Sequence, residues 1–207
     1  MPMFGLPAST AVNQPLPKKA FFEKFNLKAA ERNRFDADIS RMVIVARISQ
    51  ATVPALAAGK DITGFYFVQV ILKQKAYSDQ CLLLLNKLVG QKMIFALQYS
   101  EETQFAVFHT RLLKSDWQKT ESVSLDLKGL TLDDAWQNFV SSIGGLDAQA
   151  EETIEEQIIN REQREKLLRQ IEILEKQCRA EKQTRKKYEF HQQIMTIKDK
   201  LNDMNHE

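Results

Sequence analysis

Cysteine is one of the scarcest residues in this chain of 207 amino acids, which contains only Cys81 and Cys178. The two lie far apart in sequence and in apolar stretches with helical spacing, so they predict reduced thiols rather than a disulfide framework. Long apolar runs are also absent, because none reaches the roughly 18 residues that span a bilayer. The N-terminus lacks the charged stretch and apolar core of a secretory signal. These absences predict a cytoplasmic protein that does not act at a membrane.

The residues that most often build catalytic sites are few. Histidine occurs only at His109, His191 and His206, which are too widely spaced in sequence to form a local metal motif. Folding alone could bring two of them together. The sequence has no glycine-rich phosphate loop with a Lys-Ser or Lys-Thr ending and no Cys-x-x-Cys motif. We therefore expect no catalytic residue, no metal site and no cofactor.

One catalytic alternative remains open, a divergent metal-dependent nuclease. Nucleases of the restriction type place an acid on one strand and an acid-x-Lys on the next, so that carboxylates hold a divalent ion beside the attacking water. Asp36 and Asp38 precede the first expected strand, and Lys73 ends the second. That second strand, residues 64–73, contains no Asp or Glu. The metal ligands that this chemistry needs are therefore incomplete.

An excess of positive charge is missing, since 29 basic and 27 acidic residues give a net charge of +2. Residues 148–207 carry 12 Lys and Arg and 13 Asp and Glu, a net of −1, which leaves 17 − 14 = +3 for the rest. A dedicated nucleic-acid-binding protein is usually much more basic. The candidate phosphate contacts are Lys18 and Lys19 in a basic cluster with Lys24, Lys28, Arg32 and Arg34, and Arg185, Lys186 and Lys187 in a second cluster with Lys182. A solvated surface is the competing interpretation of both clusters.

The most informative absence is that of glycine and proline between Ile154 and Met204. A segment without these breakers predicts long helices. Its apolar residues recur at alternating spacings of three and four, which is the narrow stripe of a coiled-coil seam. Such a stripe needs a partner helix, so we expect an arm that assembles with itself, as in a homodimer, or with another chain. The expected assembly residues are Leu167, Ile171, Leu174, Cys178, Phe190, Ile194, Ile197 and Leu201.

Two arrangements of the arm remain open. The apolar stripes are mirror images about Thr184, so a helical hairpin that turns near 183–185 would bury one against the other. The residues between Cys178 and Tyr188 are nevertheless strong helix formers without a Gly, Asn or Pro turn. This composition favours one continuous helix, whose stripes would meet a second copy in antiparallel register.

The remaining sequence predicts an α+β body over residues 18–145, after an irregular, proline-rich leader over 1–17 and before the arm over 146–207. Gly144-Gly145 marks the boundary between body and arm. We expect a mostly antiparallel sheet with helices on one face. The expected helices are residues 18–25, 28–40, 78–89 and 132–143, and the expected strands are residues 42–48, 64–73, 93–99, 104–110 and 123–127.

Several sequence blocks, in unchanged order, resemble a known family. They are Leu6-Pro7-Ala8-Ser9-Thr10, Pro17-Lys18-Lys19-Ala20-Phe21, Asp38-Ile39-Ser40-Arg41-Met42, Ile48-Ser49-Gln50-Ala51-Thr52-Val53, Val68-Gln69-Val70, Gly129-Leu130-Thr131-Leu132-Asp133, Trp136-Gln137-Asn138-Phe139 and Glu181-Lys182-Gln183 with Arg185-Lys186. The blocks resemble the family called domain of unknown function 4391 and cover almost the whole chain. Val89-Gly90-Gln91-Lys92 departs from the Ile-Pro that is typical of the family before the third strand.

The resemblance implies a function that the residues alone do not indicate. Such proteins look like partners of helicases and DNA methyltransferases in prokaryotic defence loci. We therefore expect an accessory, non-catalytic subunit of a DNA-targeting antiviral defence or restriction complex, which docks on a helicase or methyltransferase through its body and arm. The alternatives are the divergent nuclease and a stand-alone DNA-binding adaptor. The resemblance supplies no catalytic residue.

Overall fold

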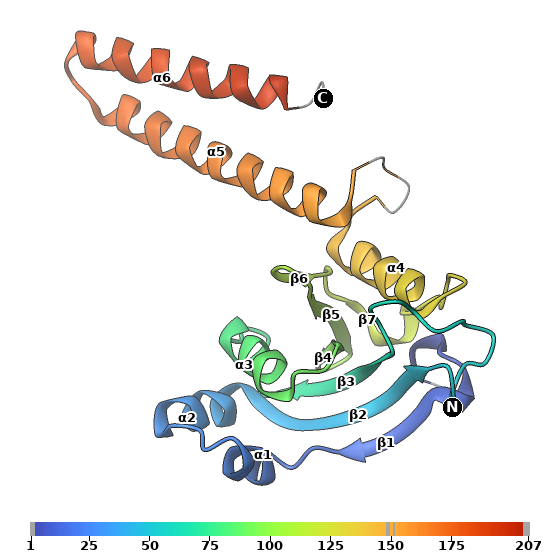
Figure 1. The fold of residues 1–207 in the computed structure, drawn as a ribbon. Coiled ribbons are helices and arrows are strands. Elements are labelled where there is room, and N and C mark those ends of the chain that lie inside the picture. The colour runs from blue at the N-terminus through green and yellow to red at the C-terminus, as the bar shows by residue number, and fades with distance from the viewer. Residues whose placement is uncertain (1–2, 148–149, 151, 205–207) are drawn as a thin grey trace. The chain divides into compact units, whose positions relative to one another are not determined.

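The structure, a computed structural model, describes residues 3–147, 150 and 152–204 and divides the chain into two compact units (Figure 1). The body comprises Met1–Gln149 and the arm comprises Ala150–Glu207. Met1 and Pro2 of the expected leader, and His206 of the arm, lie outside the described residues. No described helix combines the length and the apolar character needed to cross a membrane.

A seven-stranded sheet forms the centre of the body, in the order β1-β2-β3-β4-β5-β6 with β7 paired to β5. All neighbouring strands are antiparallel except β3 and β4, which are parallel. The predicted α+β class with a mostly antiparallel sheet is confirmed. The strands are β1 (Ala11–Pro15), β2 (Ile39–Ser49), β3 (Gly64–Leu72), β4 (Met93–Tyr99), β5 (Glu102–Phe108), β6 (Leu112–Lys114) and β7 (Gln118–Lys119).

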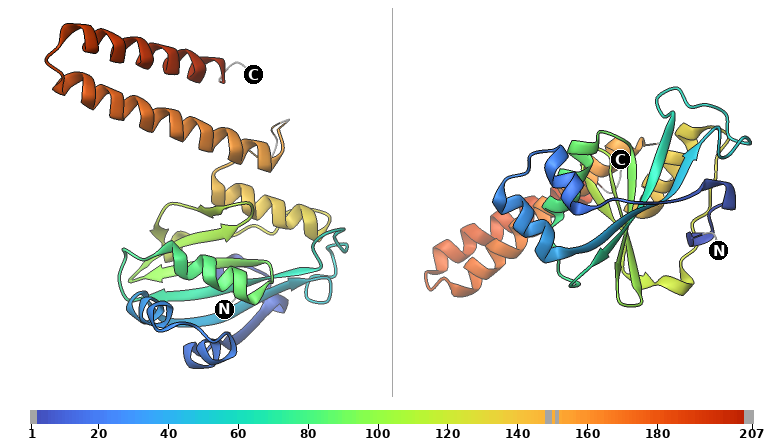
Figure 2. Two further views of the ribbon diagram at one scale, coloured as in Figure 1. Left: turned by 60° about the vertical axis from the view of Figure 1, so that its left-hand side comes forward. Right: turned by 90° about the horizontal axis from the view of Figure 1, so that it is seen from below.

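Helices cover both faces of the sheet, so the expectation that they share one face was wrong (Figure 2). On one face, α1 (Lys18–Lys24), α2 (Ala29–Asp38) and α3 (Asp79–Val89) share a core with alternate side chains of β3 and β4. On the other face, Phe65 and Phe67 of β3 contact Trp136 and Phe139 of α4 (Leu132–Gly144). The reason lies in β3, which is apolar on both sides and therefore requires cover on both.

The parallel pair of β3 and β4 is connected by α3, because parallel strands need a crossover between them. Ser78 begins this helix, and its hydroxyl accepts a hydrogen bond from the backbone N–H of Gln80 at 3.4 Å. Gly90 ends it in the left-handed conformation, at φ 65°. The crossover thus places the start of α3 beside the end of β3.

The predicted irregular leader is partly ordered instead. Two 3₁₀ turns, Met3–Gly5 and Ala8–Thr10, precede β1, which pairs with β2 at the edge of the sheet. Every residue of β1 is exposed, and Pro15 ends it, as edge strands tolerate. An exposed strand has no apolar alternation, so the sequence carried no strand signal here.

The strand predicted over residues 123–127 was also wrong. The chain forms β6, β7 and a 3₁₀ turn at Thr120–Ser122, and residues 123–129 contain no helix or strand. Leu125 is nevertheless buried, and its backbone N–H donates to the carbonyl of Phe4 at 2.8 Å. The alternation that predicted a strand therefore reflects packing against the N-terminal turn.

The arm is a helical hairpin of α5 (Ile154–Ala180) and α6 (Thr184–Asp203), which corrects the preference for a continuous helix. The two helices are joined by three residues, Glu181 to Gln183, of which the first and the last have an extended backbone. The Glu181 carboxylate accepts hydrogen bonds from the backbone N–H groups of Lys182 at 2.7 Å and Gln183 at 2.9 Å. The Glu181 side chain thus satisfies the backbone N–H groups of a turn where a glycine or asparagine is usually found, so no such helix-breaking residue is needed.

Candidate functional site

The three residues of the nuclease hypothesis do meet in the body, at the junction of α2, β2 and β3. Ile39 pairs with Leu72 in the antiparallel register, so the residues before β2 lie beside those after β3. The Lys73 ammonium donates to the backbone carbonyl of Asp36, and the backbone N–H of Lys73 donates to the carbonyl of Asp38 at 2.8 Å. Asp36, Asp38 and Lys73 therefore form one polar junction.

Asp38 has a structural set of partners within this junction. Its side chain is 6% exposed and accepts hydrogen bonds from the backbone N–H of Ser78 at 2.9 Å and from the amide of Gln74 at 3.2 Å. The thiol of Cys81 lies 3.9 Å from the same carboxylate. These contacts attach the end of α2 to the start of α3, which explains a buried carboxylate without a metal ion.

Cys81 is not prepared to act as a nucleophile. The pKa of its thiol is raised to about 12, mainly by burial and then by the negative charge of Asp38, which outweighs the opposing effect of the Arg34 charge. A thiol with this pKa stays protonated at neutral pH, and the thiolate is the reactive form. The Asp38–Cys81 pair is therefore a packing contact.

Asp36 is engaged as well, because its carboxylate pairs with the Lys18 ammonium at 2.5 Å. Lys18 also donates to the backbone carbonyl of Ile39 at 3.0 Å. Among the described residues, no cluster of three or more His, Cys, Asp or Glu side chains has an arrangement suited to a metal ion. The polar junction thus holds three elements together, and Lys18, a predicted phosphate contact, is part of it.

A second polar arrangement, which lies at the surface and was not predicted from the sequence, holds the long loop between β2 and β3. Asp133 in the first turn of α4 accepts backbone hydrogen bonds from Lys60 at 2.5 Å, Ile62 at 2.7 Å and Asp61 at 3.3 Å. Burial raises the pKa of the Asp133 carboxyl, but the three backbone donors outweigh it, and the pKa lies below its ordinary value. We call this arrangement the Asp133 clamp.

Gly59 allows the loop to approach Asp133 this closely. A Cβ atom at this position would lie 2.4 Å from the Asp133 Oδ1 atom and 2.6 Å from the Ile62 carbonyl oxygen. Gly59 lies in a loop and Asp133 in the first turn of a helix, and the contact between loop and helix joins positions more than 70 residues apart. No local signal could have found it.

The body also contains an apolar cavity of about 620 Å³ between α1, α3 and the sheet. Half-buried side chains such as Phe21, Ile44, Tyr66 and Leu88 line it, and Lys24 lies at its edge. The clustered aromatic residues of α1 are the sequence signal that could have indicated it. Its walls carry few polar groups, so its chemistry is that of an apolar contact surface.

The predicted assembly residues of the arm pack against one another within the hairpin. Six of the eight form one apolar cluster: Leu167, Ile171, Leu174, Ile194, Ile197 and Leu201. Near the turn, the Cys178 thiol contacts the Lys187 carbonyl at 3.7 Å, and Phe190 is half-buried. The Glu175–Lys198 ion pair, at 3.8 Å, also joins the two helices. The coiled-coil seam therefore finds its partner helix in the same chain.

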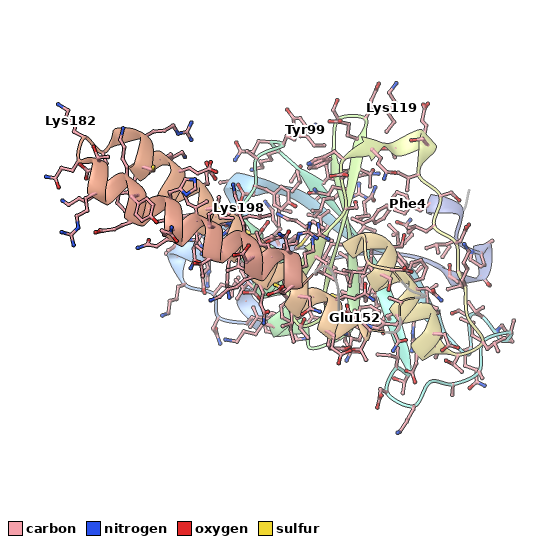
Figure 3. The ribbon with its side chains drawn as sticks, turned by 90° about the horizontal axis from the view of Figure 1, so that it is seen from above. Phe4, Tyr99, Lys119, Glu152, Lys182 and Lys198 are labelled. Carbon is pink, nitrogen blue, oxygen red and sulfur yellow. The ribbon has the colours of Figure 1, made fainter. Side chains whose placement is uncertain are left out.

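The second basic cluster lies at the tip of the hairpin, where Lys182 projects from the turn (Figure 3). Lys182, Arg185, Lys186 and Lys187 are all exposed, and Arg185 pairs with Glu189 at 3.4 Å. In the first cluster, Lys19 is exposed. Lys24, Lys28, Arg32 and Arg34 of that cluster are exposed as well, so both clusters present accessible cations.

A sequence model described as "Domain of unknown function (DUF4391)" matches residues 4–201. The chain belongs to the DUF4391 family. The resemblance that the sequence blocks predicted is confirmed. No curated protein and no solved structure matches the chain.

The match also defines what a DUF4391 domain includes. It begins in the first 3₁₀ turn and ends at Leu201 in the last turns of α6, so it covers both the body and the hairpin. The hairpin is therefore a part of the DUF4391 domain and not an appendage to it.

Proposed function

We propose that this DUF4391 protein is an accessory, non-catalytic subunit of a DNA-targeting antiviral defence or restriction complex in the cytoplasm. Its body and arm would dock on a helicase or DNA methyltransferase. The association with such enzymes is what the family resemblance implies. The proposal assigns the chain a role in assembly and leaves the chemistry to the partner.

One observation supports this role above the others. The polar residues of the body that resemble catalytic groups, Asp36, Asp38 and Lys73, bind one another or neighbouring elements. Carboxylates with such partners stabilise the fold and are poorly placed to hold a metal ion. The arm, by contrast, exposes apolar side chains, including Ile159 at 52%. Exposed apolar surface on a helix is typical of a protein contact.

Co-purification tests the proposal directly. The full chain would be expressed with a tagged helicase or methyltransferase subunit from the same genome and purified through the tag. We expect the two proteins to elute together in a fixed ratio at 0.5 M salt, because apolar contacts resist screening. Separation of the proteins from every such enzyme tested would contradict the proposal.

The nuclease alternative is tested on the purified chain with plasmid DNA and magnesium or manganese. We expect no cleavage. The informative variant is Asp36→Asn, because the Asp36 side chain is 53% exposed and its loss leaves the core intact. Cleavage that disappears in this variant at an unchanged melting temperature would establish the nuclease and contradict the accessory role.

The exposed tip of the hairpin favours a second candidate function, a DNA-binding adaptor. Arg185, Lys186 and Lys187 could contact phosphates in a sequence-independent way, and such binding weakens steeply with salt. A gel-shift titration from 50 to 200 mM salt tests this, with all three residues changed to Glu. Lys19→Glu is the matched change in the body. DNA affinity that survives both sets of changes would exclude these residues as the contact.

A further inference from the structure

The hairpin leaves an apolar groove along one of its sides, although the coiled-coil seam is closed within the chain. The groove has a volume of about 450 Å³ and is lined by Gln170, Ile173, Leu174, Gln193, Thr196 and Ile197. None of these residues is charged, whereas α5 alone carries six basic and six acidic residues. The ion pairs Arg161–Glu165 and Glu172–Lys176 lie outside the groove. An uncharged surface of this kind on a highly charged arm is typical of a contact surface.

The hairpin has little apolar interior of its own. Only Ile171, Ile194 and Leu201 are buried in its shared cluster, at 7–9% exposure. Two helices bury one stripe each, and the stability of helices in proteins comes mainly from such packing. A further pair of helices packed against the groove would bury Ile173 and increase the burial of Leu174 and Ile197. Two copies of the hairpin would then form a four-helix bundle.

The charge of the arm favours a second copy of the hairpin as the occupant of the groove. In the tip half, residues 169–194, seven Lys and Arg oppose four Asp and Glu, a net of 7 − 4 = +3. In the other half, residues 152–168 and 195–204, there are five Lys and Arg and seven Asp and Glu, a net charge of 5 − 7 = −2. A second hairpin in antiparallel orientation would place each positive tip beside a negative base. This polarity makes the arm complementary to itself.

The position of the groove agrees with this orientation. The midpoint of α6 falls between Gln193 and Ile194, and Gln193 lines the groove. A two-fold axis through the groove would therefore overlap two α6 helices along their whole length. At about 1.5 Å per residue, each tip would reach roughly 15 Å past the axis, onto the base of the other hairpin. An isologous contact of this kind closes at two chains.

We propose that the arm binds a second copy of this chain through the groove, forming an antiparallel, two-fold symmetric four-helix bundle. Six uncharged residues line the contact, among them the exposed Ile173, and the opposed charges of tip and base fix the antiparallel orientation. This self-association is separate from the proposed accessory role, which concerns binding to a different protein.

The mass of the full chain in solution tests the dimer. Light scattering after size exclusion should give twice the chain mass of 23.9 kDa. Ile173→Glu should weaken the dimer by tenfold or more, roughly the effect of one disrupted anchor residue. Leu168→Glu is the matched control, because Leu168 is 51% exposed on the same helix and does not line the groove. Five residues separate the two positions, which is about 140° around the helix.

The outcomes separate clearly. A dimer that Ile173→Glu dissociates and Leu168→Glu preserves supports the groove, with circular dichroism at 222 nm showing equal helix content in both variants. A wild-type monomer at 100 µM would overturn the proposal. A dimer that tolerates Ile173→Glu, or that both changes dissociate equally, would place the contact elsewhere.

Charge reversal tests the orientation without touching the groove. Lys182→Glu with Lys186→Glu changes the tip from +3 to −1, and Glu162→Lys with Asp203→Lys changes the base from −2 to +2. Each pair alone should weaken the dimer at 50 mM salt, and the four changes together should restore it. Additive weakening in the fourfold variant would exclude the antiparallel arrangement. These measurements use the purified chain alone, so a failure to bind a helicase or methyltransferase leaves their result unaffected.

Discussion

At the scale of single residues, Asp36 and Asp38 show that the same residue type two positions apart can have different roles. Asp38 is buried and binds the start of α3, whereas Asp36 lies at the surface in an ion pair with Lys18. The nuclease alternative grouped the two acids with Lys73, and the structure does bring them together. The sequence could not predict that Ser78, 40 residues later, supplies the donor that makes Asp38 structural.

Asp38→Asn should therefore destabilise the body. The amide has one acceptor oxygen in place of two, so it cannot accept from both the Ser78 N–H and the Gln74 amide as the carboxylate does. An unsatisfied buried donor costs about 2 kcal/mol. For a chain of this size the melting temperature should fall by roughly 4–8 °C. Asp36→Asn is the control and should cost less than about 1 kcal/mol, because solvent screens an exposed pair. Equal effects of the two changes in thermal unfolding would contradict the assigned roles.

The Asp133 clamp should make the stability of the body dependent on acid. The pKa of the Asp133 carboxyl is lowered from its ordinary value of 3.8. The contribution of this carboxylate to the stability of the body is therefore complete above pH 3.8 and disappears as the pH falls through the lower folded-state pKa. Asp133→Asn removes this titration. We expect the melting temperature of the wild type to fall more steeply than that of the variant below about pH 4. Parallel curves between pH 5 and pH 2.5 would show that the clamp does not titrate.

At the scale of elements, the sequence predicted those that carry an apolar face and missed those that do not. The strand at Met93–Tyr99 and the helices α3 and α4 lie within a residue or so of their predicted positions, because their apolar periodicity and caps are strong. The exposed β1 gave no such signal. The hairpin turn was missed for another reason, since the Glu181 carboxylate replaces the expected breaker.

Glu181→Ala should shift the arm toward a continuous helix, because alanine favours helix and removes the acceptor for two backbone donors. Spin labels at Glu175 and Lys198, which pair across the hairpin, would be about 35 Å apart in one straight helix. Pulsed electron resonance in a Cys178→Ser background measures this distance. Glu172→Ala is the control on α5. An unchanged short distance in Glu181→Ala would mean that packing alone fixes the turn.

At the scale of the whole molecule, the chain offers separate optical probes of its two units. Both tryptophans, Trp117 and Trp136, lie in the body, whereas the described part of the arm is almost entirely helical. If the arm dimerises, helix loss followed at 222 nm should include a component whose midpoint rises with protein concentration. The tryptophan fluorescence transition should not change between 1 and 100 µM. A helix signal that is equally independent of concentration would count against the dimer.

The Asp133 clamp also constrains the order in which the body can be completed during synthesis. The acceptor of the backbone N–H groups at residues 60–62 is Asp133, more than 70 residues further along the chain, so these groups lack this acceptor until Asp133 has been synthesised. A ribosome that adds about 5–20 residues per second supplies Asp133 at least several seconds after the loop has been made. The strand pair β2–β3 can form in that interval, but its connecting loop cannot be fixed. A nascent chain that stops before α4 lacks this acceptor, so we expect proteases to cut the loop more readily in that chain than in the complete body.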